Sequence, residues 1–284
     1  MITISLAFHR IRKELSVICS ASESAAVAHV LLEHITGYDR AARLTRGDDV
    51  LNAAQTKALE GALVRLLTGE PIQYITGEQW FMGRPFYVTS DVLIPRPETE
   101  ELVQWVLSEW KQRNNISILD IGTGSGCIPI TLQLSMPGSQ VFSLDVSEKA
   151  LLVAAQNASR QEANVNFVCG DFLDGQVKER LGMHDVIISN PPYIPYSDKD
   201  LLDKNVGAFE PGVALFVPDD DPLLFYRHIA SFSQTQLKDG GAVYCELNQD
   251  LAQATADLFE GLGFIATMKQ DIFGNDRMLR ASKK

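Results

Sequence analysis

Apolar positions at helical spacing dominate the first seventy residues. One set recurs every three or four residues in the stretch SESAAVAHVLLEHITG and comprises Val27, Val30, Leu31 and Ile35. This pattern predicts a helix that starts at Ser22 or Ser24 and stops at Gly37. A second set in NAAQTKALEGALVRLLTGEP repeats the design, with Gly69 and Pro71 behind it, and comprises Leu59, Leu63, Leu66 and Leu67. Residues 1–75 are therefore expected to form a small helical bundle, either a substrate-recognition domain or a scaffold.

The pattern changes between residues 76 and 95. The stretch WFMGRPFYV holds two short aromatic runs around Gly83, which predicts a β-hairpin that links two domains. A helix is expected directly after it, because Pro97 suits a first helical turn. The acidic side chains there complement the positive end of the helix dipole, and they are Glu98, Glu100 and Glu101.

Strands and helices alternate beyond residue 115. The apolar runs ISILDIG, QVFSLDV, NVNFVCGD, DVIISN and GAVYCEL have strand length, and helical stretches such as SEKALLVAAQNASRQ and PLLFYRHIASFSQTQL lie between them. This alternation predicts a doubly wound α/β sheet with helices on both faces. The chain of 284 residues is thus expected to hold two domains, at 1–75 and 96–284, with the hairpin linker at 76–95.

Composition narrows the class of protein. Apolar residues make up 45% of the chain, yet no run approaches the roughly 18 needed to span a bilayer, and the first residues lack a secretory layout. A cytoplasmic, monomeric protein without a membrane segment is expected. Residues 1–75 carry equal numbers of acidic and basic side chains, so the whole net charge of −11 lies in residues 76–284. Such a negative field disfavours binding to nucleic acid.

Cysteine and histidine spacing gives no metal-binding pattern. The four cysteines lie far apart without a CxxC pair, and the five histidines form no HxxxH spacing. Buried, reduced thiols and no metal site are expected.

The first candidate site follows the first predicted strand, in LDIGTGSGCIPI. Gly122, Gly124 and Gly126 occupy a strand-to-helix turn, where glycine lets the backbone approach a ligand closely. The spacing departs from the dinucleotide fingerprint because Cys127 stands where the third glycine belongs. A tight turn without a ligand is the alternative explanation.

Acidic and aromatic residues follow the next two strands. Asp145 ends the second strand, where a carboxylate accepts hydrogen bonds from both hydroxyls of a ribose, or caps a helix. After the third strand, Asp171 is placed to bond an exocyclic amine and Phe172 to lie against an adenine ring; a capping aspartate and a core phenylalanine are the alternatives. Ligands bind at the carboxyl ends of strands in open α/β sheets, and this order fits an adenosine cofactor without a pyrophosphate.

The fourth strand ends in the sequence NPPY. Asn190 precedes a proline, which favours an extended backbone, and the prolines fix φ and donate no N–H. The result is a rigid edge rich in acceptors, the side-chain oxygen of Asn190 and the carbonyl of Pro191, with the flat face of Tyr193 beside it. Together with Pro192 these residues are suited to hold a planar –NH₂ group by both hydrogens.

These motifs together resemble S-adenosylmethionine-dependent, Rossmann-like methyltransferases that act on planar amino or amide nitrogens. NPPY is shared with adenine-N6 DNA methyltransferases. The stretch EPIQYITGEQWFMGRPFYVTSDVLIPRPETEELV, with FEPGVALF and DIFGNDRMLRA, resembles the release factor glutamine methyltransferases, the PrmC/HemK family. The resemblance extends from the helical domain to the final strand, and it implies a Rossmann-like methyltransferase sheet with a small N-terminal helical-bundle domain.

The resemblance implies roles for matching positions. The cofactor's methionine and ribose would be lined by Gly122, Thr123, Gly124, Ser125 and Gly126. Asp145 would bind the ribose, and Asp171 and Phe172 would lie at the adenine. The substrate glutamine would be held by Asn190, Pro191, Pro192 and Tyr193, with Asn190 also against the cofactor. Asn190, Pro191 and Tyr193 would be the catalytic residues. Arg96, Pro97 and Glu98 would shape the mouth of the pocket, and Arg96 and Glu210 would belong to the substrate-binding site.

One position departs from the family pattern. The family usually has glycine two residues after the glutamate of the fifth strand, whereas Asn248 follows Glu246 here. Asparagine tolerates positive φ better than most residues, so we expect the turn to persist.

The implied reaction is methyl transfer to the side-chain amide of the glutamine in the Gly-Gly-Gln motif of bacterial peptide-chain release factors. It requires no catalytic histidine or cysteine, because the methylated amide nitrogen loses its proton to water. Arg40, Arg43 and Arg46 would contact the release factor or form a solvated face. The alternatives are a glutamine methyltransferase acting on a ribosomal protein, a DNA adenine-N6 methyltransferase, an inactive adaptor on this fold and, last, a dehydrogenase.

Overall fold

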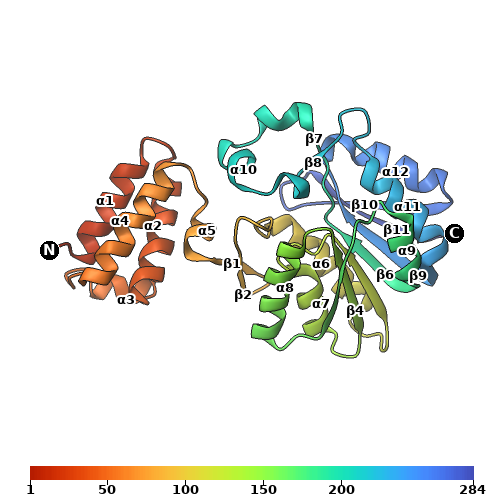
Figure 1. The fold of residues 1–284 in the computed structure, drawn as a ribbon, viewed down its shortest axis with the longest axis horizontal. Coiled ribbons are helices and arrows are strands. Elements are labelled where there is room, and N and C mark those ends of the chain that lie inside the picture. Colours follow the sequence, from red (N-terminus) through yellow and green to blue (C-terminus); the bar gives the residue numbers. More distant parts are fainter. The chain divides into compact units, whose positions relative to one another are not determined.

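The chain forms two compact units (Figure 1). The computed structural model describes the backbone of residues 1–284 and every side chain except that of residue 204. The helical unit comprises Met1–Glu78 and Lys204–Phe209, and the sheet unit comprises Gln79–Asp203 and Glu210–Lys284. A short segment from the second half of the sequence thus belongs to the N-terminal unit.

The helical unit has one apolar core. Its helices are α1 (Ile4–Leu15), α2 (Ala21–Thr36), α3 (Arg40–Thr45), α4 (Ala53–Leu67), α5 (Ile72–Thr76) and α10 (Lys204–Phe209). Leu31, Leu59 and Leu63 are almost fully buried in this core. Each predicted apolar face includes one residue that is exposed, Val30 in α2 and Leu67 in α4.

Side-chain caps fix where these helices begin. Helix α2 starts one residue after Ser20, whose hydroxyl accepts a hydrogen bond from the backbone N–H of Glu23. The predicted start at Ser22 or Ser24 is therefore wrong, since Ser20 already supplies the cap and Ser24 is buried inside the helix. Helix α4 begins with a capping box between Asn52 and Gln55.

The arginine cluster of α3 differs from the expectation. Arg43 is buried, and its guanidinium donates to the backbone carbonyl of Tyr38 and to Glu33. Arg40 and Arg46 are exposed, and Arg46 also donates to the Tyr38 hydroxyl. Arg43 is thus a structural residue of the helical unit, because its buried Nη1 donates to groups of that unit and not to solvent.

The predicted hairpin is confirmed as β1 (Glu78–Phe81) and β2 (Arg84–Tyr87). Met82 and Gly83 turn the chain, both with positive φ. Phe81 and Phe86 are fully buried and pack edge to face, with ring centroids 6.0 Å apart. The hairpin is therefore held by the core of the sheet unit.

The sheet unit contains a seven-stranded sheet in the order β10-β11-β9-β6-β3-β4-β5. Its strands are β3 (Ser117–Ile121), β4 (Gln140–Asp145), β5 (Val165–Cys169), β6 (His184–Ser189), β9 (Leu237–Glu246), β10 (Phe264–Gln270) and β11 (Asp276–Lys283). The five predicted strands are confirmed and run parallel, while β11 lies antiparallel between β9 and β10. A separate two-stranded sheet joins β7 (Ile194–Pro195) to β8 (Phe216–Val217).

Helices cover both faces of this sheet (Figure 1), as predicted. One layer contains α6 (Pro97–Trp110), α7 (Cys127–Ser135) and α8 (Glu148–Gln161), and the other contains α9 (Gly175–Arg180), α11 (Leu224–Gln236) and α12 (Ala252–Gly261). Short 3-10 turns are η1 (Tyr196–Leu201), η2 (Gly212–Ala214) and η3 (Gln249–Leu251). Alternate side chains of one strand enter different cores: Ile188 packs in the first layer and Ile187 in the second.

The four thiols are free, but they are not all buried. Cys127 and Cys245 are buried, Cys19 is half-buried and Cys169 is exposed. The prediction of buried thiols is wrong for Cys169, because it ends β5, the edge strand of the sheet.

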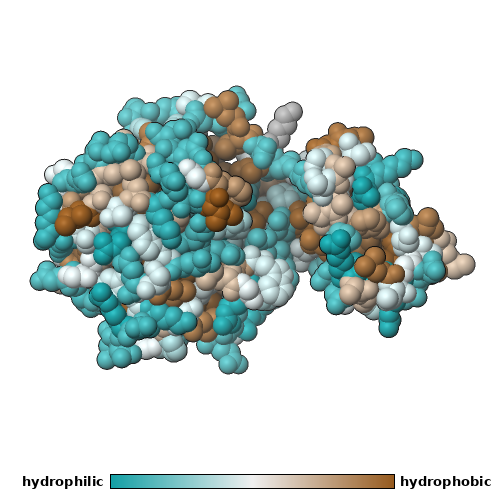
Figure 2. All heavy atoms as spheres, turned by 180° about the vertical axis from the view of Figure 1, so that it is seen from behind, coloured by the Kyte–Doolittle hydropathy of each residue, from teal (hydrophilic) through white to brown (hydrophobic). Residues whose placement is uncertain are grey.

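Hydrophobic side chains are scattered on the face shown in Figure 2, where patches of brown lie among hydrophilic residues. Isolated exposed apolar residues are normal on protein surfaces. Every helix in the described part of the chain is too short or too polar to traverse a lipid bilayer.

Candidate active site

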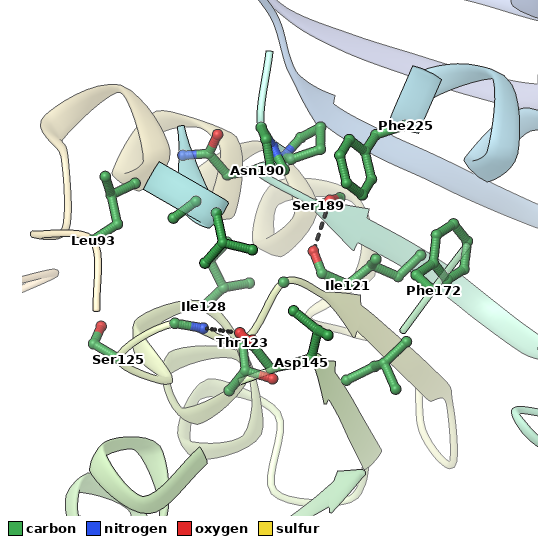
Figure 3. Close-up of a pocket in the computed structure, with 18 of the residues that line it drawn as sticks. Leu93, Ile121, Thr123, Ser125, Ile128, Asp145, Phe172, Ser189, Asn190 and Phe225 are labelled. Carbon is green, nitrogen blue, oxygen red and sulfur yellow. Dashed lines mark hydrogen bonds between the residues drawn. The ribbon is translucent and has the colours of Figure 1, made fainter. Parts of the chain in front are cut away.

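A cavity of about 270 Å³ opens at the carboxyl ends of β3, β4 and β6. All of its walls come from the sheet unit. The wall residues are 121–125, 144–146, 170–173 and 189–192, with Leu93, Pro95, Arg96, Thr99, Cys127, Ile128, Val213, Ala214 and Phe225. Figure 3 shows Asp145 and Asn190 on opposite sides of this cavity.

Most of the predicted site residues lie in these walls. The cavity brings together Gly122, Thr123, Gly124, Ser125, Asp145, Asp171, Phe172, Asn190, Pro191, Pro192 and Arg96. Five residues that the sequence assigned to the site are not among the described wall residues, namely Gly126, Tyr193, Glu210, Pro97 and Glu98. The parallel strands explain the grouping, because their carboxyl ends meet at one edge of the sheet.

The glycine-rich turn has one open and one packed glycine. Gly124 has φ 52°, and a Cβ built on it would meet no atom within 4 Å. Gly126 has φ 81°, and its Cβ would lie 2.8 Å from Ile130 Cδ1 and 3.1 Å from Ala154 Cβ. Gly124 therefore leaves room for a ligand against the backbone, whereas Gly126 lets α7 start close to α8.

Asp145 ties this turn to the end of β4. Its Oδ2 accepts a hydrogen bond from the N–H of Gly124 at 2.9 Å, and its Oδ1 accepts one from Ser147 at 2.9 Å. A carboxylate offers about four acceptor positions, so both oxygens can accept further hydrogen bonds. The half-buried carboxylate thus has free acceptor positions suited to a pair of ligand hydroxyls.

Phe172 was expected either to contact an adenine or to be a core residue, and the structure agrees with both in part. Its ring packs edge to face on Phe232, with centroids 5.5 Å apart, and is 4% exposed, yet it also lines the cavity. Asp171 is exposed, and its Oδ1 accepts from the N–H of Leu173 at 2.8 Å. Asp171 therefore caps a turn at the edge of the cavity.

Asn190, Pro191 and Pro192 of the NPPY segment form the opposite wall. Asn190 Nδ2 donates to the hydroxyl of Thr99 at 3.1 Å. Pro191 is buried and Pro192 is half-buried. Tyr193 is not among the described wall residues, and its hydroxyl donates to Glu246 Oε1 at 3.3 Å.

Sequence reasoning assigned no role to Thr99 or Glu246. Glu246 ends β9 and is 2% exposed, and its Oε2 accepts from the Thr99 hydroxyl at 2.6 Å. Burial raises the pKa of the Glu246 carboxyl to about 7, although the hydrogen bond from Thr99 opposes the shift. The only sequence signal was the position of Glu246 at the end of a predicted strand.

Asn157 was also missed. This buried residue of α8 accepts from the N–H of Tyr87 at 2.7 Å and donates to the carbonyls of Tyr87 and Ser125. It thereby joins the hairpin to the glycine-rich turn. The sequence signal that could have revealed it is a single asparagine among the alanines of a predicted helix.

Asn248 replaces the family glycine without strain. Its φ is −71°, and its side chain accepts from the N–H of Asp250 and donates to the carbonyl of Tyr193 at 3.3 Å. The turn is present, but the expected reason for it, that asparagine tolerates positive φ, is wrong. The turn needs no positive φ here, and asparagine caps η3.

An ion pair supports the mouth of the cavity. Arg96 Nη2 donates to Glu210 Oε1, and Glu210 Oε2 accepts from the N–H of Ile94 at 3.1 Å. The Glu210 side chain is 1% exposed, against 32% for Arg96. Glu210 thus acts behind the wall as the counter-ion of Arg96.

Replacing Arg96 with alanine is expected to lower the free energy of unfolding of the sheet unit by about 2 kcal/mol. Breaking a buried pair costs more, but the partial exposure of Arg96 lets water reach the remaining charge. Urea denaturation of the full chain measures the loss. The double variant R96A/E210Q should recover part of it, and a double variant no more stable than R96A would contradict this account.

Taken together, the cavity has an acceptor pair for a diol on one side, apolar walls, and an acceptor-rich rim on the other side. The open Gly124 and the Asp145 carboxylate fit an adenosine cofactor. Nothing in this arrangement requires a nucleophilic side chain.

Two family models match the chain, and solved structures share its fold. The PrmC N-terminal domain matches residues 7–77, and the methyltransferase small domain matches residues 100–204. A methyltransferase from Pyrococcus furiosus superposes with a TM-score of 0.53 at 19% identity, over 78% of this chain and 98% of that one. A 16S rRNA methyltransferase from T. thermophilus, in complex with AdoMet and guanosine, gives 0.51 at 14% identity over 73% and 50%. These likenesses show a methyltransferase fold.

Sequence relatives match over nearly their whole length. A release factor glutamine methyltransferase from Flavobacterium psychrophilum is 42% identical, over 94% of this chain and 95% of the relative. The enzyme of that name from Bacteroides thetaiotaomicron is 39% identical, over 96% and 98%. With its helical N-terminal domain, its methyltransferase sheet and these full-length matches, the chain belongs to the release factor glutamine methyltransferase family.

Proposed function

We propose that this protein transfers a methyl group from S-adenosylmethionine to the side-chain amide nitrogen of the Gly-Gly-Gln glutamine in bacterial peptide-chain release factors. Full-length similarity to the enzymes of that name supports the substrate. The observation that carries the proposal is one cavity with Asp145 on one side and the NPP segment on the other. That arrangement would bring a bound cofactor and a planar amide next to each other.

The cofactor would lie along the ends of β3, β4 and β5. Gly122, Thr123, Gly124 and Ser125 would surround its methionine and ribose, with Gly126 holding the turn from behind. Asp145 would accept the ribose hydroxyls, because its two oxygens keep free acceptor positions. Asp171 and Phe172 would border the adenine.

The glutamine amide would meet Asn190 Oδ1 and the carbonyl of Pro191. Both accept hydrogen bonds, so they would grip the two hydrogens of the –NH₂ group. Pro192 would stiffen this rim, and Tyr193 would support it through Glu246. Arg96, held by Glu210, would border the entrance.

The reaction requires alignment more than acid–base chemistry. When bound, S-adenosylmethionine supplies an electrophilic methyl group on a sulfonium and departs as a neutral thioether. The role of Asn190 and Pro191 is to orient the amide nitrogen and stabilise the positive charge that grows on it. The nitrogen then releases its proton to water, so no basic side chain is needed.

The helical domain, residues 1–75, would recognise the release factor. Arg40 and Arg46 are exposed and available for such a contact, unlike Arg43. The proposal includes a monomer that acts in the cytoplasm, where release factors work, and that does not bind DNA directly. The net charge of −11 supports the last point.

Incubation with labelled cofactor and a purified release factor tests this function. Label is expected on the release factor and not on a variant whose Gly-Gly-Gln glutamine is replaced by alanine. Ribosomal proteins and duplex DNA form parallel arms for the two alternative substrates. Label that persists after the loop glutamine is replaced would refute the proposal.

A further inference from the structure

A continuous chain of side-chain hydrogen bonds runs behind the NPPY wall. Asn190 Nδ2 donates to Thr99 Oγ1 at 3.1 Å, and Thr99 Oγ1 donates to Glu246 Oε2 at 2.6 Å. Tyr193 donates to the other carboxylate oxygen, Oε1, at 3.3 Å. Thr99 is 3% exposed and Glu246 is 2% exposed, so the chain is sheltered from water. It connects α6, β9 and the segment after β6.

The carboxylate sets the direction of every bond in this chain. An ionised carboxyl only accepts, so the Thr99 hydroxyl must point its hydrogen at Glu246. The lone pairs of that hydroxyl then accept from Asn190, which fixes Nδ2 toward Thr99 and leaves Oδ1 on the other side. Burial raises the pKa of the Tyr193 phenol, so Tyr193 stays protonated and donates.

We propose that Thr99 and Glu246 are positioning residues of the methyl transfer, which orient Asn190 so that its Oδ1, and not its –NH₂ group, faces the acceptor amide. The inference rests on the proposed function and deepens it. An amide side chain presents either its oxygen or its nitrogen at nearly equal steric cost, and only the oxygen can accept from a substrate –NH₂ group. The wall therefore needs a device that selects one orientation, and the Thr99–Glu246 pair supplies it.

Protonation of Glu246 would reverse this direction. A protonated carboxyl donates, so Thr99 could accept from Glu246 and turn its own hydrogen toward Asn190. Asn190 would then point Oδ1 at Thr99 and its –NH₂ group at the substrate. Arg277 favours the charged form of Glu246, whereas Glu98 disfavours it. Tyr193 and the Cys127 thiol also face Glu246 and stay protonated near neutral pH, because burial raises the pKa of both.

The ionisation of Glu246 is expected to make kcat depend on pH. With the pKa of Glu246 at about 7, the accepting carboxylate predominates above that pH and is lost as the pH falls below it. We expect kcat to rise from pH 6 to pH 8 with a midpoint near 7. In the Glu246→Gln variant kcat is expected to be lower and this rise to disappear, because an amide accepts at one end only and does not titrate.

Threonine variants test the hydrogen-bond chain directly. Thr99→Val keeps the shape and removes the hydroxyl, and we expect kcat for release-factor methylation to fall by roughly tenfold, with smaller changes in KM and in the cofactor dissociation constant. Thr99→Ser should restore most of the activity. Thr255→Val is the matched control, because Thr255 is fully buried in α12, lies outside the described cavity wall, and its hydroxyl donates to the carbonyl of Leu251. A wild-type kcat in Thr99→Val, or an equal fall in Thr255→Val, would overturn the inference.

A second measurement does not depend on the substrate. In protein labelled with ¹⁵N-asparagine, the side-chain –NH₂ signal of Asn190, assigned by its loss in Asn190→Ala, is expected to titrate near pH 7 and to stop titrating in Thr99→Val. Equal titration in both proteins would refute coupling through Thr99. If the wild type fails to methylate release factors, the proposed function falls, while this signal still decides the inference.

Discussion

Replacing Asn190 with alanine is expected to lower kcat for release-factor methylation by about 10²- to 10³-fold, the cost typical of removing one preorganised polar group from a reaction centre. The substitution removes the side-chain acceptor for the substrate amide and leaves only the carbonyl of Pro191. The cofactor dissociation constant should change much less, since Asp145 and the glycine-rich turn remain. Single-turnover methylation with labelled cofactor gives the first quantity, and calorimetry gives the second.

Asn190→Asp sharpens the same test. Aspartate has the same shape and keeps an acceptor, but it loses the –NH₂ group that donates to Thr99 and adds a negative charge near Glu246. We expect its kcat to fall nearly as far as that of Asn190→Ala. A nearly active Asn190→Asp would mean that any acceptor suffices at this position, and equal losses of kcat and cofactor affinity in Asn190→Ala would assign Asn190 to cofactor binding alone.

The parts of the site that follow strand ends were predictable from the sequence. Asp145 and Asn190 stand directly after apolar runs, and parallel strands bring their carboxyl ends to one edge. The repeated alternation of strand and helix predicted a doubly wound sheet, and its five predicted strands are parallel in the structure. Position relative to a strand therefore predicted which residues share the cavity walls.

The support behind the walls was not predictable, because it depends on contacts between distant segments. Thr99 and Glu246 are 147 positions apart, and a threonine in the first turn of a helix has an ordinary capping explanation. Tyr193 belongs to the same support and not to the described wall, although its place in NPPY suggested a face on the substrate. The direction of a side chain that follows a strand depends on packing, which the spacing of apolar residues in the sequence does not reveal.

The edge of the sheet shows a similar limit. Strand β10 pairs with β11, the next strand in the sequence, but β11 inserts antiparallel between β10 and β9, so the pairing of β9 with β11 skips a strand. In β10 the exposed Ile265 and the partly buried Ala266 are both apolar, so the sequence of this edge strand gives only a weak alternation of polar and apolar residues. The central strands, buried on both faces, give the clearer signal.

Replacing Asp145 with alanine is expected to weaken binding of S-adenosylmethionine by about 10²-fold. Hydrogen bonds to a charged acceptor contribute roughly 1.5 kcal/mol each at the low end, and the loss of two ribose contacts gives about 3 kcal/mol, or about 10²-fold in affinity. The variant also releases the N–H groups of Gly124 and Ser147, which loosens the turn that would border the cofactor. Calorimetric titration with the cofactor measures the change.

Asp174→Ala is the matched control for this prediction. Asp174 is an exposed carboxylate outside the described cavity wall that accepts from the N–H of Gln176 at 2.9 Å, so its loss removes the same charge and a similar turn contact. Its cofactor affinity should stay near the wild-type value, whereas Asp145→Asn, which keeps one accepting oxygen, should lie between the wild type and Asp145→Ala. Because the ribose contact requires acceptors at both carboxylate oxygens, full affinity in Asp145→Asn would contradict the proposed role. Unchanged affinity in Asp145→Ala would show that the cofactor does not bind at the end of β4.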